Sequence, residues 1–415
     1  MTKIFLAAVC GIILSFSSTA QLVQWRGEMR DGHFRNEKNL LKEWPAEGPE
    51  MILKVEGIGT GFSSPILANG TIYVTGMKDT LDYLSAIDFS GNLKWQVPYG
   101  RSWIQSFPDT RSSPTIDGDR IYVLAGVGRL GCFNAADGSE IWAVNVDKDY
   151  EGEWHTWGVS ESPLIVGDLV ICTPGGGVTS MVAFDKMTGR EIWRTPSVGG
   201  QRSYVSPTIY EYNGKQYILA ATARNLFAIH PQNGEVAWSY SYIDAKEWDQ
   251  PGLIWANTPI WDGDQIYISK GYDFPSKMLK VNAEGTGVTE VFTNEVLDNH
   301  HHGVVLVDGY VYASNWINNG KGNWVCMDWK TGEIKWETTW ENKGAIVYAD
   351  GLLYLYEEKR GNVALVKPNP DQLEVVSSFR ITEGSGPHWA HPFISDGKLL
   401  LRHGNVLMVF NIQGV

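Results

Sequence analysis

The fold of this chain is decided by the segment Ala183-Phe184-Asp185-Lys186-Met187-Thr188-Gly189-Arg190-Glu191-Ile192-Trp193. An Asp side chain can accept hydrogen bonds from the backbone of a turn, and a following Gly can adopt a positive φ. The Trp then begins the next strand, where its large ring can stack on a neighbouring element. The segment therefore predicts two strands joined by a tight turn, with the Trp docked on an adjacent sheet.

Related copies of this segment recur along the chain and end at Trp95, Trp142, Trp238 and Trp336. Each copy belongs to a unit of about 40 to 50 residues that repeats throughout the sequence. The units open on similar dipeptides: Ser64-Pro65, Ser113-Pro114, Ser162-Pro163, Ser206-Pro207 and Thr258-Pro259, with His391-Pro392 in the same place late in the chain. One supersecondary unit is therefore repeated.

Each opening is followed by a short apolar strand, a Gly turn and a second strand rich in Tyr, Ile and Val, which suit a buried pleated surface. The eight second strands begin at Thr71, Arg120, Leu169, Gln216, Gln265, Tyr310, Leu352 and Leu399. A third and a fourth strand complete each unit. This pattern predicts an all-β chain that forms a single eight-bladed β-propeller of four-stranded antiparallel blades.

The last unit, from His391 to Val415, has room for only three strands, while one spare apolar strand, Met51 to Val55, precedes the first unit. Pairing these segments would close the ring and remove its exposed edges. The fifth unit has Asn282 in place of the Asp and no Trp, and the seventh lacks the whole turn signature. A ring of seven blades would require one of these weak units to be an insertion, so we expect eight.

Three regions are predicted: a secretory signal at 1–20, an N-terminal leader at 21–50 and the propeller at 51–415. The signal has Lys3, an apolar run and small residues before Gln21. A lipoprotein alternative would use Cys10, but it would cut within the apolar run. No later stretch approaches the roughly 20 apolar residues of a membrane span. We expect a secreted protein, periplasmic or extracellular, and a monomer.

Charge and cysteine content exclude several function classes. The net charge is −13 and the basic residues are scattered, which argues against a nucleic-acid partner. Cys132, Cys172 and Cys326 remain after signal removal and lie in apolar strands, so we expect them to be buried rather than disulfide-bonded. The sequence contains no CxxC pair and no CxxCH haem motif, so no metal site is predicted.

The recurring A-x-D-x-x-x-G-x-x-x-W pattern resembles the tryptophan-docking motif of pyrroloquinoline-quinone (PQQ) dehydrogenase propellers, a repeat shared with the non-enzymatic propeller of the outer-membrane assembly lipoprotein. The resemblance covers nearly all of the chain after residue 20. The leader, Trp25-Arg26-Gly27 through Arg30-Asp31-Gly32, resembles the start of other secreted PQQ-like repeat proteins. Many quinone-dependent relatives have two adjacent cysteines and a Glu-Asn-Asp calcium set, neither of which we can match here. No cofactor is therefore expected, although the resemblance leaves PQQ with calcium open.

The links between blades should lie on the same face of the ring as the turns between second and third strands, and we call this the top face. Its links contain six of the nine histidines: His155, His300, His301, His302, His388 and His391. They also contain seven tryptophans: Trp103, Trp154, Trp157, Trp248, Trp255, Trp340 and Trp389. Blade packing does not require this clustering, which predicts a binding site on the top face.

Several polar residues stand immediately before the unit openings and should ring the axis: Arg111, Glu161, Arg202, Tyr204, Asn257 and Lys343. Cationic and amide groups with aromatic walls suit a polyhydroxylated or carboxylated ligand. The predicted ligand-binding residues are Arg111, Trp157, Glu161, Trp255, Asn257, His300, Lys343, Trp389 and His391. As an alternative, the tryptophans fill gaps between blades and the charged residues form ion pairs there.

The sequence favours a binding protein that holds a carbohydrate, another small molecule or a partner protein through its top face, and it leaves open whether the chain is catalytic. One catalytic alternative is a PQQ-dependent dehydrogenase. Another is a polysaccharide lyase, since elimination from a uronic acid needs a base, a proton donor and a positive group on the carboxylate. His302, Tyr204 and Arg202 could fill these three roles.

Overall fold

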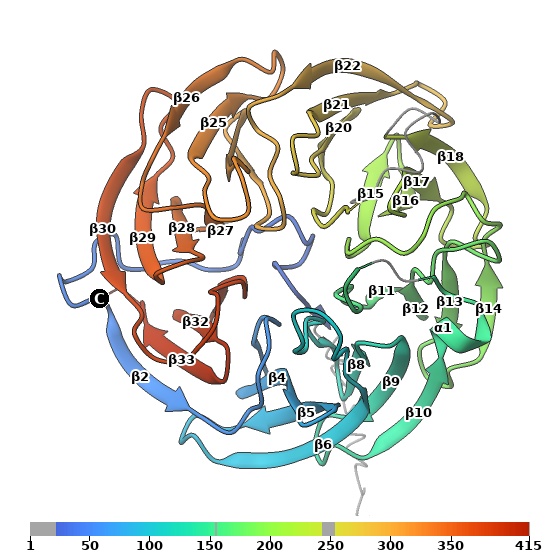
Figure 1. Ribbon diagram of the computed structural model, residues 1–415, viewed down its shortest axis with the longest axis horizontal. Helices are drawn as coiled ribbons and strands as arrows, with labels where there is room; N and C mark the ends of the chain where they lie inside the picture. The colour runs from blue at the N-terminus through green and yellow to red at the C-terminus, as the bar shows by residue number, and fades with distance from the viewer. Residues whose placement is uncertain (1–21, 154–155, 243–253, 415) are drawn as a thin grey trace, which may run out of the picture.

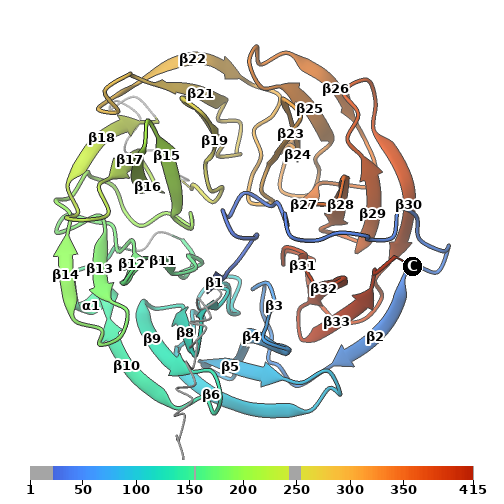
Figure 2. The same cartoon turned by 180° about the vertical axis from the view of Figure 1, so that it is seen from behind.

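The computed structural model describes residues 22–153, 156–242 and 254–414. The predicted signal at 1–20 lies outside the described residues, as do Trp154, His155 and Trp248. Figures 1 and 2 show the described strands as eight sheets arranged in a ring around one axis. The prediction of an eight-bladed all-β propeller is therefore confirmed, and the alternative of seven blades is wrong.

The first four blades follow the chain in order, each with its innermost strand first. Blade one contains β3 (Ile66–Ala68), β4 (Thr71–Lys78), β5 (Leu81–Ile87) and β6 (Leu93–Arg101). Blade two contains β7 (Thr115–Asp117), β8 (Arg120–Leu124), β9 (Arg129–Asn134) and β10 (Glu140–Asn145). Blade three contains β11 (Leu164–Val166), β12 (Leu169–Cys172), β13 (Val182–Asp185) and β14 (Glu191–Arg194). Blade four contains β15 (Thr208–Tyr212), β16 (Lys215–Ala221), β17 (Asn225–Ile229) and β18 (Val236–Ser241).

The next three blades repeat the same antiparallel order. Blade five contains β19 (Ile260–Asp262), β20 (Gln265–Ile268), β21 (Ser276–Val281) and β22 (Val288–Asn294). Blade six contains β23 (Val305–Val307), β24 (Tyr310–Ser314), β25 (Trp324–Asp328) and β26 (Ile334–Thr338). Blade seven contains β27 (Gly344–Ala349), β28 (Leu352–Glu357), β29 (Asn362–Lys367) and β30 (Glu374–Arg380).

Blade eight closes the ring by combining the two ends of the propeller. Its strands β31 (Phe393–Ser395), β32 (Lys398–His403) and β33 (Val406–Asn411) are completed by β2 (Glu50–Val55) as the outermost strand. Glu50 lies opposite Asn411 and Val55 opposite Leu407 in the antiparallel pair. The predicted closure by an N-terminal strand is therefore confirmed.

The tryptophan signature joins neighbouring blades as predicted. Trp142 of blade two packs against Gly189 of blade three, where a Cβ atom would lie 2.7 Å from the indole ring and φ is 72°. The indole Nε1 of Trp142 also donates to the Lys186 carbonyl at 3.1 Å. Blade five places Phe292 against Gly332 in the same way. An aromatic ring on a glycine turn thus connects these blades even where the sequence pattern is weak.

The N-terminal leader is part of the ring rather than a separate segment. Its strand β1 (Leu22–Val23) pairs with β7 of blade two, and His33 forms a bridge with Tyr348 of blade seven. Figures 1 and 2 show the leader, in blue, crossing the ring centre between these blades. The leader therefore links blades that lie far apart around the ring.

Two leader arginines bind the innermost strands from within. Arg30 donates to the carbonyls of Ser162, Pro163 and Pro207, and Arg26 donates to those of Val304 and Ile346. Burial lowers the pKa of Arg30 to about 9 and that of Arg26 to about 10. Both remain cationic at neutral pH, and their charge is solvated by backbone carbonyl groups.

Two further expectations from the sequence are met in the described part of the chain. Cys132, Cys172 and Cys326 are free thiols with buried side chains. The four-residue helix α1 (Val146–Asp149) follows β10, and among the described residues there is no helix long and apolar enough to cross a bilayer.

Candidate binding site on the top face

An arc of aromatic side chains connects the links around blades eight, one, two and three. Trp389 precedes β31, and its ring lies 4.9 Å from that of Phe62 and 5.8 Å from that of Phe107. Phe107 continues to Trp157 at 6.5 Å, and Trp157 to Tyr204 at 5.6 Å. These five rings come from successive interblade links, so the arc follows the circumference of the ring.

A second arc begins at the same tryptophan and covers blades five and six. The His301 ring lies 5.5 Å from that of Trp389 and 4.4 Å from that of His300. Tyr272 lies 4.4 Å from His300 and 5.2 Å from Trp316. None of the rings in either arc is fully buried. We call the two arcs together the aromatic mouth: Phe62, Phe107, Trp157, Tyr204, Tyr272, His300, His301, Trp316 and Trp389.

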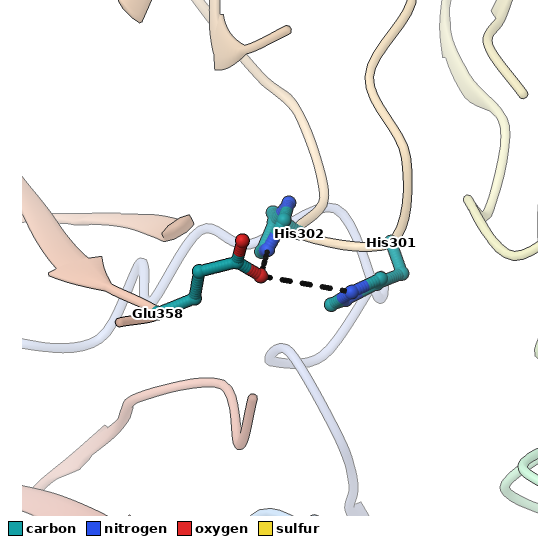
Figure 3. Close-up of side chains that lie close together, drawn as sticks. All are labelled: His301, His302 and Glu358. Carbon is teal, nitrogen blue, oxygen red and sulfur yellow. Dashed lines mark hydrogen bonds and ion pairs between the residues drawn. The ribbon is translucent and has the colours of Figure 1, made fainter. Parts of the chain in front are cut away.

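A cluster of two histidines and a carboxylate lies beside the aromatic mouth (Figure 3). His302 Nε2 lies 3.0 Å and His301 Nε2 4.0 Å from the same oxygen, Glu358 Oε2. Trp389 Nε1 donates to this oxygen at 2.9 Å, and Lys343 Nζ lies 3.7 Å from Oε1. Glu358 follows β28 of blade seven, so the cluster joins this turn to the link between blades five and six.

Burial sets the protonation of the cluster. Desolvation lowers the pKa of His301 and of His302 well below their usual value, and the nearby Lys343 ammonium adds to this effect. Desolvation also lowers the pKa of Lys343, although Glu358 opposes that shift. At neutral pH the site therefore presents neutral imidazole rings, which can accept a hydrogen bond or bind a metal ion.

The backbone that carries the histidines is held in place from two sides. The Asn257 side chain donates to the carbonyls of Asn299 at 2.6 Å and His300 at 2.9 Å. His391 Nε2 lies 3.0 Å from the His301 carbonyl. These contacts fix a link that has no regular secondary structure, so the positions of the imidazole rings are preorganised.

Five of the predicted ligand-binding residues lie at or beside the mouth. Trp157, His300 and Trp389 are members of its two arcs, and Lys343 contacts Glu358. The Arg111 guanidinium lies 5.8 Å above the Phe62 ring. The sequence therefore located the face, and these residues remain its predicted ligand contacts.

The other four predicted ligand-binding residues are buried between blades. Glu161 is fully buried and accepts a hydrogen bond from the Thr173 amide at 3.0 Å. Trp255 is also fully buried and donates to the Asn257 carbonyl, while His391 packs against Arg26. These contacts give Glu161, Trp255, Asn257 and His391 a supporting position behind the mouth.

The three residues predicted for lyase chemistry have separate sets of partners. Arg202 is buried, forms an ion pair with Asp147 and donates to the Thr173 carbonyl. The Tyr204 hydroxyl accepts a hydrogen bond from the Trp157 amide at 2.9 Å, whereas His302 contacts Glu358. Their described contacts do not assemble a base, a proton donor and a cation around one point.

The sequence analysis missed Glu358 and four rings of the mouth: Phe62, Phe107, Tyr272 and Trp316. Glu358 directly follows an apolar strand as the second residue of the pair Glu357-Glu358, a pattern typical of a solvated strand end. The only available signal was its place in a turn between second and third strands. A search of these turns for carboxylates would have found it.

A separate pocket of about 880 Å³ lies between blades one and two. Its lining includes Thr80, Ser102, Trp103, Val127 and Asp147, from turns and links of these two blades and the short helix. It shares none of the residues that define the aromatic mouth.

The eight blades, the docked aromatic rings and the site on the link face define a PQQ-like repeat propeller, as the sequence resemblance implied. The sequence profile of the family described as outer membrane protein assembly factor BamB matches residues 82–338. Because this range includes more than half of the chain, the chain belongs to that family.

Two curated relatives show how much of the chain is matched at the sequence level. Outer membrane protein assembly factor BamB from Alkalilimnicola ehrlichii is 25% identical over 212 residues, which cover 50% of this chain and 48% of the relative. The protein of the same name from Bordetella pertussis is 24% identical over 211 residues, which cover 44% of this chain and 49% of the relative. The match thus spans about half the length of these relatives.

Solved structures of a BamB protein and of a quinohemoprotein dehydrogenase share the propeller fold. BamB from Moraxella catarrhalis superimposes with a TM-score of 0.61 at 16% identity and covers 87% of this chain and 97% of its own. Quinohemoprotein alcohol dehydrogenase from Comamonas testosteroni gives a TM-score of 0.61 at 14% identity, with 88% and 77% covered. At these identities the likeness establishes the propeller fold alone.

Proposed function

We propose that this chain is a ligand-binding propeller that holds an acidic carbohydrate at the aromatic mouth. The observation that carries the proposal is the pair of connected aromatic arcs on the link face, with Arg111 over the Phe62 ring. Partly exposed rings offer apolar faces against which the CH groups of a sugar ring can pack. Arg111 supplies the positive charge that a carboxylated sugar requires.

Arg111 is the group best suited to meet a carboxylate. Its guanidinium is partly exposed, stacks on Phe62 and donates to the Asp109 carbonyl at 3.0 Å, so its plane is held in position. A planar guanidinium can form two parallel hydrogen bonds to a carboxylate. The Phe107 ring lies between the rings of Trp389 and Trp157 and contacts both. We therefore propose that the sugar carboxylate binds Arg111 and that the sugar rings stack on these tryptophans.

The proposal is tested by calorimetric titration of the purified chain with a uronic-acid oligosaccharide and with a neutral oligosaccharide of the same length. We expect the acidic ligand to bind more tightly. R111A should weaken its binding at least about tenfold, since a hydrogen bond to a charged group contributes about 1.5–3 kcal/mol. W389A should weaken it about two- to tenfold, since a stacked ring contributes about 0.5–1.5 kcal/mol. R194A is the matched control because Arg194 is exposed on β14 of blade three. The proposal would be overturned if the unmodified chain bound both sugars with equal affinity, or if R111A bound the acidic sugar as tightly as the unmodified chain does.

A partner protein is a second candidate ligand for the same face. The family match favours it, because the family is described by its role in the assembly of outer membrane proteins. Together with the predicted signal at 1–20, this description supports a site of action in the periplasm. An acidic segment of such a partner could bind Arg111 as a sugar carboxylate would.

The residues of the mouth do not fit a calcium-bound quinone. Calcium takes six to eight oxygen ligands. At the mouth, Glu358 offers one carboxylate beside two imidazole rings, and the Asp298 carboxylate already accepts the amides of Asp273 and Trp316. We therefore propose no step that uses PQQ. A melting-point comparison with and without PQQ and calcium tests this, because a specific ligand raises the melting temperature.

A further inference from the structure

We propose that His301, His302 and Glu358 bind a divalent first-row transition metal such as Zn²⁺. One ligand atom from each of the three side chains lies within 4.8 Å of the other two. Two imidazole nitrogens and one carboxylate oxygen form a donor set that zinc accepts. The proposal does not depend on the carbohydrate, because metal binding by the chain can be measured without a sugar.

The distances from the two imidazoles to the carboxylate oxygen are close to those of a tetrahedral site. Ligand atoms about 2.0–2.1 Å from a tetrahedral zinc ion are about 3.3 Å from one another. His302 Nε2 lies 3.0 Å from Glu358 Oε2 and His301 Nε2 lies 4.0 Å from it. The first distance already fits, and the second requires a side-chain movement of less than about 1 Å. Figure 3 shows both rings directed toward this oxygen.

The three protein ligands would leave at least one coordination position for another group. The side chains of His302 and Glu358 are 1% and 7% exposed, whereas that of His301 is 23% exposed. Since His301 belongs to the aromatic mouth, the metal would be reached from that side. The remaining coordination position therefore faces the mouth, where it can take water or an oxygen atom of a ligand.

The histidines of the cluster differ from those that only support the fold. His403 uses both ring nitrogens, on the carbonyls of Glu383 and Gly386, and His391 uses both, on Arg26 and the His301 carbonyl. His302 is 1% exposed, yet its Nδ1 has no hydrogen-bond partner among the residues described. A buried nitrogen left in this state costs about 1–3 kcal/mol. Because no partner in the described structure fixes a proton on Nδ1 or removes one from it, the ring can take the tautomer that leaves Nε2 unprotonated for a metal.

Two neighbouring side chains orient the Glu358 carboxylate so that one of its oxygens can bind a metal ion. Lys343 Nζ lies 3.7 Å from Oε1, while Trp389 Nε1 donates to Oε2, the oxygen that the two imidazoles face. Outer groups of this kind orient metal ligands. On metal binding, His302 would carry its single ring proton on Nδ1, and the ion would lie between Nε2 and Glu358 Oε2.

The test is a titration of the purified, untagged chain with Co²⁺ and Zn²⁺ after treatment with a chelator. We expect one metal ion per chain, visible d–d absorption from bound cobalt, and a higher melting temperature with zinc. E358Q and H301A should each weaken zinc binding at least about tenfold. H230A is the matched control, because His230 lies in an outer turn and its ring packs on Tyr217. It should bind zinc as the unmodified chain does.

Failure of the unmodified chain to take up zinc or cobalt would overturn the proposal, as would equal zinc affinity in E358Q and the unmodified chain. Near-UV circular dichroism in chelator shows whether each variant is folded. If both variants fail to fold, X-ray absorption of the cobalt-loaded unmodified chain decides the question. Two imidazole ligands with oxygen support the site, and any other donor set contradicts it.

Discussion

Two groups of charged and polar side chains lie near the ring axis, and they use their hydrogen-bonding capacity differently. Arg30 of the leader is surrounded by acceptors, since it donates to Gln24, Thr115 and three backbone carbonyls. At the top face, His300 and His302 each keep one buried ring nitrogen without a partner in the described structure. Buried polar groups with all their hydrogen bonds made stabilise a fold, whereas a polar atom without a partner can form a hydrogen bond to a ligand. Hydrogen-bond satisfaction thus distinguishes Arg30 from the two histidines.

The largest effect should come from removing Arg30. We expect R30A to lower the free energy of unfolding by at least about 3 kcal/mol, because it leaves several buried carbonyls unpaired. Urea unfolding measures the change. The control is R35A, since Arg35 is 47% exposed and pairs with Asp31 at the surface, where the loss should stay below about 1 kcal/mol. Equal losses in both variants would break the comparison, because the leader arginine would then not be a structural element.

The next effect concerns the buried histidines, which should make the fold sensitive to acid. Burial, with smaller contributions from His403 and Arg380, lowers the pKa of His388 to about 3. Below pH 6.5 the unfolded chain therefore binds a proton that the folded chain does not, so stability falls as the pH drops from 6.5 toward 3 and is fully present above 6.5. The contribution is at most about 1.4 kcal/mol per pH unit, and less where solvent screens the ring.

Urea unfolding of H388Q and the unmodified chain at pH 7 and pH 5.5 measures this contribution. H388Q should lose less stability than the unmodified chain over that interval, although it starts from a lower value because Tyr356 loses its contact with His388 Nδ1. Parallel changes in the two proteins would show that His388 is not held neutral in the fold.

The smallest effect should distinguish two tryptophans with similar burial. Trp193 Nε1 donates to the Pro231 carbonyl at 2.9 Å, whereas Trp238 Nε1 has no hydrogen-bond partner in the part of the chain described. W193F should therefore cost about 1 kcal/mol more than W238F, since only the first loses a hydrogen bond. Their side chains are 7% and 5% exposed, which makes the variants comparable in urea unfolding. A larger loss of stability for W238F than for W193F would contradict the expectation that paired polar groups contribute more to stability than unpaired ones.

The number of blades and their closure could be predicted because both depend on local, repeated features. The Gly turn and its Trp mark five of the blades, and the spare strand at Met51 to Val55 needed only a partner at the other end. Phe292 was missed because a different aromatic residue occupies the position of the Trp. The leader arginines were missed because their acceptors are carbonyls, which carry no sequence signal.

The face of the candidate site could be predicted, but the depth of its residues could not. Repeat register placed Trp157 and Trp389 on the link face, where the structure has them. The same register could not show that Glu161 and Trp255 turn inward, because irregular links have no fixed period of side-chain direction. Glu358 comes from a different blade than the histidines it contacts, so only the closed ring brings them together.

The pairing of β2 with β33 has a consequence for how the protein is made. A ribosome delivers Glu50 long before Asn411, its partner across the last blade. Until the C-terminal segment has been synthesised, the strand at Glu50–Val55 has no partner on either edge, because β33 is its only neighbour among the described strands. Blade eight is therefore the last to form. In the nascent chain β2 is the segment that most needs protection from aggregation.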